Sequence, residues 1–341
     1  MSLTHSRIIV ITGAKGFIGS VLTANALATG WQVIALDDCS RGLNSVEALL
    51  ATSANKHRGK FIKHDCREGL EPIFDEYAQI SGWGLERTKA GFPVVDAVVH
   101  LAAGTGSLSR PYEELVEFIV EMTQRIFKDA AAHGVKSFAF PTTSLIEGVP
   151  DSPYVLSKQH AMDWLLKQDS GIGIIPLQFY NVTGAYAGFS EIRQLEVHIL
   201  PIMLECFMNS KPFIVNGNDY DTIDGTPGRD FSNVRDVAEV ILALTAQQLG
   251  PVPFKTSQVI KLGTGVTTTA KQMISMFNDF IFPKTGRKLE YEIGPRRAFD
   301  CGALRCDQPY LHMYTTPTLV KNSMHQELVT ILDKVYNVRY A

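Results

Sequence analysis

The sequence predicts an α/β protein with a doubly wound parallel sheet and a smaller C-terminal lobe. Four apolar β-formers at residues 8–11 lead into a glycine-rich turn, after which apolar residues recur at helical spacing. A second apolar strand, residues 31–36, ends in two aspartates. Further apolar strands alternate with helical patterns along the first half of the chain, which is the order typical of βαβ units.

The turn after the first strand has glycines at 13, 16 and 19, a spacing typical of dinucleotide-binding turns. Gly13 permits the sharp turn, Gly16 lets a pyrophosphate approach the backbone, and Gly19 lets helix and strand pack closely. The following helix directs its free N–H groups and positive dipole end toward the phosphates. Taken alone, the spacing is a weak signal, because glycines in such turns often serve only the turn itself.

An acidic residue at the end of the second strand favours NAD over NADP. Asp37 can accept hydrogen bonds from the ribose hydroxyls of adenosine and would repel a 2′-phosphate. Arg41 is close enough in sequence to pair with such a phosphate if its loop folds back. Residues 60–64 predict a third strand, and Asp65 after it either accepts from the adenine amino group or caps the next helix.

Two further predicted strands end in small or hydroxyl side chains. Residues 93–101 form a buried strand followed by the small residues 102–104, which leave room for a cofactor ribose. Residues 135–140 form the next strand, and the hydroxyls of Thr143 and Ser144 follow it. Side chains at the carboxyl ends of parallel strands face the crevice in which ligands bind.

Tyr154 and Lys158 lie four residues apart on one face of a helix that Pro153 can open. The ammonium favours the phenolate, so it lowers the pKa of the tyrosine, and its donors can hold the nicotinamide ribose. With a strand-end hydroxyl this pair makes a proton-transfer site, in which tyrosine is the acid/base and the hydroxyl donates to the substrate oxygen. The spacing alone occurs by chance in many helices.

Along nearly its whole length the chain resembles extended short-chain dehydrogenases/reductases, and most of all their UDP-glucose 4-epimerase branch. The resemblance is carried by TGAKGFIGS, VVHLAA, PYVLSK, LQFYNVTG and GNDYDTIDGTPGRDFSNVRDVAE. It implies a Rossmann-type fold, tightly held NAD and a nucleotide-sugar substrate. The implied activity is a 4-epimerase that acts through a transient 4-keto sugar, with Tyr154 taking the proton of the C4 hydroxyl.

The resemblance also assigns site residues. NAD-contacting positions fall on Gly13, Gly16, Phe17, Ile18, Asp37, Asp65, Cys66, Ala102, Ala103, Tyr154, Lys158 and Phe179. The family's catalytic hydroxyl falls on Thr143, with Ser144 as the alternative. The matched substrate positions are Asn181, Arg229 and Arg297 at the diphosphate and Asp300 at a ribose. The alternatives are a turn role for Asn181, a solvent-exposed loop position for either arginine, and an ion pair of Arg229 with its neighbour Asp230.

Departures from the family's pattern gather on the substrate side. Glu147 stands where tyrosine is usual, Asn216 where an aromatic residue stacks on uracil, His198 near a usual asparagine, and Thr105 where the closest epimerases carry lysine. Between Thr143 and Tyr154 there are ten residues, about half the length usual in the family, in a loop that covers the sugar. The cofactor positions are intact, so the sugar and the nucleotide base stay open.

Two other functions stay open at this point. An NAD-dependent sugar-nucleotide dehydrogenase or reductase would release the keto sugar, and a non-catalytic dinucleotide-binding protein would have no need of the Tyr154/Lys158 pair. Dehydratases and decarboxylases are disfavoured, because such relatives carry an acidic residue directly after the catalytic Thr/Ser, where this chain has residues 144–146, Ser-Leu-Ile.

Composition limits which partners and which cellular location we expect for the protein. The chain has 341 residues and a net charge of −3, so no basic field indicates nucleic acid. No apolar run reaches about 18 residues and no signal peptide precedes the first strand, so we expect a cytoplasmic protein without a membrane segment. The five scattered cysteines predict reduced thiols and no metal site.

The expected domains interleave in sequence. Residues 1–178, with 234–265 returning to them, are predicted to form the NAD-binding domain, and residues 179–233 and 266–341 the substrate-binding lobe. The resemblance implies a homodimer, in which the predicted helix 113–133 and the Tyr154 helix form a four-helix bundle with a second copy. The alternative is that the apolar faces of these helices pack on their own sheet.

Overall fold

The computed structural model describes residues 7–78, 95–103, 110–192, 198–251, 258–297 and 301–338. Two of the predicted site residues, Thr105 and Asp300, lie outside these ranges. The chain divides into two compact units, unit 1 with Met1–Thr142, Pro153–Leu177 and Ala238–Ile260, and unit 2 with Thr143–Ser152, Gln178–Val237 and Lys261–Ala341. The assignment of NAD to one lobe and of substrate to the other stays a prediction.

The elements that lie wholly or partly in unit 1 alternate strands with helices, as the sequence predicts. They are β1 (Ile8–Thr12), α1 (Phe17–Ala28), β2 (Gln32–Asp37), α2 (Val46–Leu50), β3 (Gly59–Lys63), η1 (Cys66–Glu68), α3 (Glu71–Ala78), β4 (Ala97–His100), α4 (Tyr112–Leu115), η2 (Val116–Glu121), α5 (Met122–Ala132), β5 (Ser137–Thr143), α6 (Pro153–Leu166), β6 (Gly173–Phe179), α8 (Val234–Gln248) and β10 (Ile260–Leu262).

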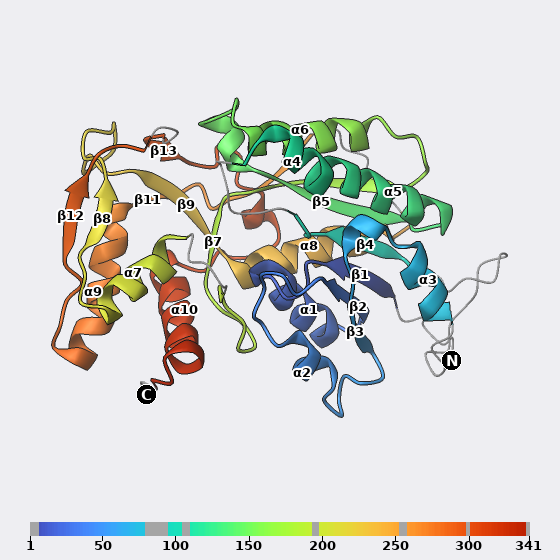
Figure 1. Ribbon diagram of the computed structural model, residues 1–341, viewed down its shortest axis with the longest axis horizontal. Helices are drawn as coiled ribbons and strands as arrows, with labels where there is room; N and C mark the ends of the chain where they lie inside the picture. The colour runs from blue at the N-terminus through green and yellow to red at the C-terminus, as the bar shows by residue number, and fades with distance from the viewer. Residues whose placement is uncertain are drawn as a thin grey trace. The chain divides into compact units, whose positions relative to one another are not determined.

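These strands form one seven-stranded sheet in the order β10-β6-β5-β4-β1-β2-β3. β1 pairs in parallel with both β2 and β4, so the order reverses on either side of β1 and the sheet is doubly wound. α1 and α2 lie on one side of this sheet, and α4, α5 and α6 on the other (Figure 1). The predicted fold class is confirmed, and the carboxyl ends of β1, β2 and β4 meet at one edge.

The core of unit 1 explains why its strands are apolar at successive positions. Ile8 and Val10 of β1 belong to a cluster with side chains of α3, α5 and α6, while all residues from Ile8 to Ile11 are fully buried. A parallel strand that helices cover on both faces needs apolar side chains on both.

Two boundaries differ from the sequence prediction. β5 runs to Thr143, because Pro141 and the two threonines continue the extended backbone that was expected to end at Phe140. The helix expected over 113–133 is present, but its middle part, Val116–Glu121, is π-helical. Buried side chains of this long helix, such as Ile126 and Phe127, pack in the core of unit 1, which was the alternative to a bundle face.

The described residues of unit 2 contain the remaining elements, which form two small sheets and three main helices. They are η3 (Ser144–Glu147), β7 (Asn181–Thr183), α7 (Ile199–Met208), β8 (Phe213–Asn216), β9 (Gly228–Asn233), β11 (Thr267–Thr269), α9 (Ala270–Thr285), β12 (Tyr291–Gly294), β13 (Ala303–Leu304), η4 (Tyr310–Met313) and α10 (Val320–Val335). β9 pairs with β7, β11 and β13, and β8 pairs with β12. α7, α9 and α10 supply most of the core of this unit.

The described ranges contain neither a membrane-spanning helix nor a metal-binding cluster. None of the helices there is long and apolar enough to cross a bilayer. The same residues contain no group of three His, Cys, Asp or Glu side chains arranged to hold a metal ion.

Candidate active site

Two glycines at the turn between β1 and α1, Gly13 and Gly19, have no room for a side chain. Gly13 has a φ of +69°, and a Cβ there would lie 2.9 Å from the backbone nitrogen of Ala102. A Cβ on Gly19 would lie 2.1 Å from the carbonyl oxygen of Gly13. α1 starts after Gly16 with no side-chain hydrogen bond to its first turn. Free helical N–H groups behind a bare glycine turn fit a dinucleotide phosphate.

Asp37 at the end of β2 is 8% exposed and joins this turn to the second strand. Its Oδ2 accepts from the backbone N of Lys15 at 2.9 Å, and its Oδ1 accepts from the backbone N of Cys39 at 2.8 Å. Burial raises the pKa of Asp37, and the two backbone hydrogen bonds oppose that effect. Each carboxylate oxygen keeps a second lone pair that can accept from a ribose hydroxyl.

Thr12 and His100 form a buried pair that the sequence analysis did not single out. They are register partners at the ends of β1 and β4, and Thr12 Oγ1 lies 2.8 Å from His100 Nδ1. The same hydroxyl accepts from the backbone N of Ala102 at 3.0 Å. Burial lowers the pKa of His100 to about 3, so this imidazole is neutral. Polar side chains at the ends of two neighbouring strands were the signal that could have found it.

Tyr154 and Lys158 lie one turn apart on α6, as predicted. The Lys158 side chain is 3% exposed, and its Nζ lies 4.5 Å from the ring centroid of Phe140. Burial lowers the pKa of Lys158 to about 7. Among the described residues, no side chain or carbonyl accepts a hydrogen bond from this ammonium, so its donors are available to the hydroxyls of a ligand.

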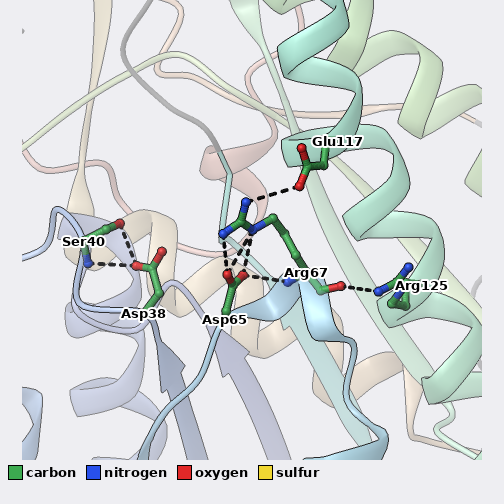
Figure 2. Close-up of polar contacts among 6 residues, drawn as sticks. All are labelled: Asp38, Ser40, Asp65, Arg67, Glu117 and Arg125. Atoms are coloured by element: carbon green, nitrogen blue, oxygen red, sulfur yellow. Dashed lines mark hydrogen bonds and ion pairs between the residues drawn. The ribbon is translucent and has the colours of Figure 1, made fainter.

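Asp65 shows the capping geometry that was the alternative to adenine binding. Its carboxylate accepts from the backbone N of Arg67 at 3.0 Å and pairs with the Arg67 guanidinium, whose Nη2 lies 2.5 Å from Oδ2 (Figure 2). Those hydrogen bonds to Arg67 lower the pKa of Asp65. Arg67 also pairs with Glu117 at 3.2 Å and lies 4.7 Å from the ring centroid of Phe118. An adenine contact by Asp65 stays a prediction.

Polar groups near the Asp65–Arg67 ion pair also have hydrogen-bond partners within the protein. Arg125 Nη1 donates to the carbonyl of Arg67 at 2.7 Å, and Asp38 accepts from both the backbone N and the hydroxyl of Ser40 (Figure 2). Cys66 is buried, which raises the pKa of its thiol. The polar groups around the end of β3 thus stabilise the loops that follow β2 and β3.

In unit 2, Thr143 ends β5 and caps η3. Its Oγ1 accepts from the backbone N of Leu145 at 3.2 Å, and no described hydrogen bond uses its hydroxyl proton. A substrate oxygen can therefore accept that proton. Ser144 begins the η3 turn and is 4% exposed, so its hydroxyl is less accessible than that of Thr143.

Among the predicted substrate residues, the structure brings Asn216 and Arg297 together. With its amide oxygen facing the guanidinium, Asn216 accepts from Arg297 Nε at 3.1 Å and from Nη2 at 3.2 Å. The pairing of Asn216 in β8 with Gly294 in β12 places the two segments side by side. Arg297 is exposed, as in its alternative role of a solvent-exposed loop arginine, and this neutral amide is its described partner.

Arg229 and Asn181 lie on the neighbouring strands β9 and β7, where Asn181 is the register partner of Phe231. Arg229 Nη1 donates to the carbonyls of Gly228 at 2.7 Å and Cys301 at 3.1 Å. Backbone carbonyls thus hold this half-buried guanidinium in one orientation.

Two further predicted residues are half-buried or exposed at segment ends in unit 2. Phe179 is the last residue of β6 and is half-buried. His198 precedes α7, and its Nδ1 contacts the buried carboxylate of Glu191. The structure does not join His198 to the Asn216–Arg297 pair by any described hydrogen bond.

The chain is similar to known epimerases in sequence and in fold. UDP-glucose 4-epimerase of Corynebacterium glutamicum is 28% identical over 319 residues, which are 87% of this chain and 86% of that protein. UDP-glucose 4-epimerase 4 of Oryza sativa subsp. japonica is 27% identical over 329 residues, covering 88% and 82%. The structure of UDP-glucose 4-epimerase from Bifidobacterium longum in complex with NAD+ and UDP matches with a TM-score of 0.77 and 21% identity, over 97% of this chain and 99% of that one.

At such identities the structural match shows the fold, and the family follows from a separate comparison. The family described as "NAD dependent epimerase/dehydratase family" matches residues 9–254, well over half of the chain. The match spans the glycine turn, Asp37, Tyr154 and Lys158, so the resemblance drawn from the sequence motifs is confirmed. This chain belongs to the NAD-dependent epimerase/dehydratase family, an enzyme family whose cofactor is NAD.

Proposed function

We propose that this protein is a sugar-nucleotide 4-epimerase that uses NAD and acts through a transient 4-keto sugar. The observation that carries the proposal is Lys158, a buried lysine whose Nζ has no described hydrogen-bond acceptor, one helical turn from Tyr154. A dinucleotide-binding protein that catalyses nothing gains no advantage from burying that charge, which costs free energy. Relatives that are themselves UDP-glucose 4-epimerases support the substrate class.

The cofactor would be held by residues of unit 1. The bare turn at Gly13, Gly16 and the start of α1 would bind the pyrophosphate, and Asp37 would accept from the adenosine ribose. Lys158 would donate to the nicotinamide ribose. When bound, NAD supplies the reversible two-electron oxidation of the sugar's C4 carbon. The remaining proposed contacts in unit 1 are Phe17, Ile18, Asp65, Cys66, Ala102 and Ala103, and Phe179 of unit 2 is a further proposed contact.

The proton is moved by the chain's own side chains. Tyr154 as phenolate takes the proton of the C4 hydroxyl and later returns it to the oxygen at C4. The Lys158 ammonium favours the phenolate by its charge. Thr143 donates its free hydroxyl proton to the reacting oxygen, or Ser144 does so in its place. The keto sugar turns over between the two half-reactions, so that its other face is reduced.

The diphosphate would be bound by Asn181, Arg229 and Arg297. Arginine offers a planar fork of donors that matches phosphate oxygens, and carbonyls already orient Arg229. His198 and Asn216 are proposed neighbours of the nucleotide, and Thr105 and Asp300 stay predicted substrate residues outside the described ranges. The departures at these positions leave the base and the sugar to be determined by experiment.

The test measures absorbance in the NADH band and the sugar products together. UDP-, GDP-, dTDP- and CDP-sugars are first screened for thermal stabilisation of the purified protein. With the sugars that stabilise it, we expect interconversion of 4-epimers without net formation of NADH. NADH release in proportion to substrate would instead show a dehydrogenase. Thermal stabilisation by NAD with no product from any sugar nucleotide would show the non-catalytic binding protein.

We also propose a homodimer through the long helix α4–α5 and α6. Support comes from Leu156 of α6, an apolar side chain that is 42% exposed, at a surface hollow of about 500 Å³ that is lined by Tyr112 of α4 and by residues within and just after α6. Such an exposed apolar side chain can pack against the same surface of a second copy. A cytoplasmic location is proposed because all five cysteines are free thiols. Light scattering of the purified protein tests the dimer.

A further inference from the structure

Glu147 is the centre of a polar cluster in unit 2. It is the last residue of η3, the short turn that starts after Thr143. Its Oε1 accepts three hydrogen bonds of 2.8 Å each, from Gln178 Nε2, Tyr180 Oη and Lys261 Nζ. These donors come from the end of β6, the residue after it, and β10. We call Glu147 and its three donors the Glu147 cluster.

In the Glu147 cluster, Tyr180 keeps its proton and Lys261 keeps its charge. Tyr180 is 6% exposed, and burial, followed by its hydrogen bond to Glu147, raises the pKa of its phenol. Burial lowers the pKa of Lys261, but hydrogen bonds to Asp307 and Glu147 raise it further, so the net shift is upward. Tyr180 therefore stays a donor and Lys261 stays an ammonium. One carboxylate oxygen is tied to a cation and to two nearly buried neutral donors.

The end of β6 determines on which face of the chain the Glu147 cluster lies. Gln178 and Tyr180 are two residues apart, and their side chains share one face, since Gln178 Nε2 lies 3.3 Å from Tyr180 Oη. Phe179 between them points to the opposite face, and Asn181 begins the next strand. Glu147 thus accepts hydrogen bonds from one face of residues 178–180, and the opposite face carries Phe179, a proposed cofactor contact.

We propose that Glu147 is a positioning residue, which holds the Thr143–Ser144 turn against the end of β6 so that Thr143 keeps its place at the reacting oxygen. The inference rests on the proposed function, because it assumes that Thr143 donates to that oxygen. Only three residues, 144–146, separate Thr143 from Glu147 at the end of η3, so movement at Glu147 reaches the hydroxyl. A displacement of about 1 Å at such a group costs roughly 100-fold in rate.

The first experiment compares kcat and KM of variants that keep or remove the accepting oxygen. Glu147→Ala is expected to lower kcat roughly 10- to 100-fold, with KM changed less than about threefold and NAD retained. Glu147→Gln keeps an oxygen acceptor of the same shape, so its kcat should stay within about fivefold of the wild type. Equal kcat for Glu147→Ala and wild type overturns the inference.

A matched control separates positioning from simple loss of stability. Asn278 also bridges two segments of unit 2, since its Oδ1 accepts from the backbone N of Leu289 at 2.7 Å and its Nδ2 donates to the same residue's carbonyl. Asn278→Ala should lower Tm without changing kcat at temperatures well below Tm. A similar kcat loss in this control would show that Glu147 acts only through stability, and would overturn the inference.

The decisive measurement is a double-mutant cycle with Thr143→Val. If Glu147 acts through Thr143, adding Glu147→Ala to Thr143→Val should lower kcat by no more than about twofold. The full loss in both backgrounds overturns the inference. If Glu147→Ala does not fold, Glu147→Asp, which keeps the charge but shortens the reach, carries the same cycle. Absence of 4-epimer interconversion in the wild type is a different result, because it refutes the proposed function itself.

Discussion

The proposed cofactor side, in unit 1, and the proposed substrate side, mostly in unit 2, differ in what holds them in place. At the glycine turn the backbone itself fills the space, and a Cβ at Gly19 would lie 2.1 Å from a carbonyl oxygen. On the substrate side, polar side chains hold one another, as Asn216 holds Arg297 and as Glu147 holds Lys261. Backbone packing tolerates almost no substitution, whereas side-chain pairs can be exchanged for others. Three of the four departures from the family's pattern, Glu147, His198 and Asn216, lie in unit 2, where such side-chain contacts are found.

The largest effect should come from Tyr154, the acid/base of the proposed reaction. Tyr154→Phe removes the phenol oxygen that takes the proton, and general acid–base catalysis contributes roughly 10²- to 10⁴-fold, so kcat should fall by at least that range. NAD should stay bound, because the turn and Lys158 are unchanged. Steady-state kinetics and the NAD content of the purified variant check both. Unaltered turnover would remove Tyr154 from the mechanism.

Lys158 should make the stability of the ligand-free protein depend on pH. Its pKa is about 7 in the fold against an ordinary value of 10.5, so between these values the unfolded chain binds the additional proton and stability rises with pH. The free energy of unfolding should increase by about 1.4 kcal/mol per pH unit from pH 7.5 to 9.5, relative to Lys158→Met. Denaturant titrations at several pH values measure this slope.

The control for that slope is Lys56→Met, which removes an exposed lysine outside the sheet. Its pH dependence should match that of the wild type. If the wild type and Lys158→Met instead run parallel over this range, Lys158 is as well solvated as an ordinary surface lysine, and the buried charge that supports the proposed function is refuted.

Much of the cofactor side was predictable because its signals are local. The glycine spacing, the strand-end aspartate and the Tyr154/Lys158 spacing each lie within one short stretch, and the structure has the predicted strand, turn and helix there. The Thr12–His100 pair was missed because it joins residues 88 positions apart. Long-range pairs of this kind follow from strand order, which a single sequence reveals only through topology.

The substrate side was less predictable for the same reason. The Glu147 cluster joins segments more than 100 residues apart in the case of Lys261, and no pattern around Glu147 indicates that contact. The sequence did show that Glu147 departs from the family's tyrosine, which marked the position without explaining it. Likewise Asp65 was open between a ligand contact and a cap, and only the placement of Arg67 showed the cap.

A smaller effect is expected on the free energy of unfolding when a glycine of each region is replaced by alanine. Gly19→Ala places a Cβ against backbone atoms that cannot move without shifting β1, and such overpacking costs about 1–3 kcal/mol. In unit 2, Gly302→Ala puts the Cβ 3.5 Å from its nearest neighbour, the Tyr220 ring, which is ordinary contact. Chemical denaturation should show a clear loss for the first variant only. A comparable loss for both would show that the two regions are packed alike.

The smallest effect is expected where a side chain only supports another, at Asn216. Arg297→Ala removes a charged donor from the proposed diphosphate site and should raise KM for the nucleotide sugar about 10- to 100-fold, since a hydrogen bond to a charged group contributes roughly 1.5–3 kcal/mol. Asn216→Ala leaves the guanidinium in place and only loosens it, because β8 and β12 still hold the two segments together. Its KM should therefore change less than about threefold. If Asn216→Ala raises KM as much as Arg297→Ala does, Asn216 itself contacts the nucleotide, and the substrate side tolerates substitution no better than the glycine turn.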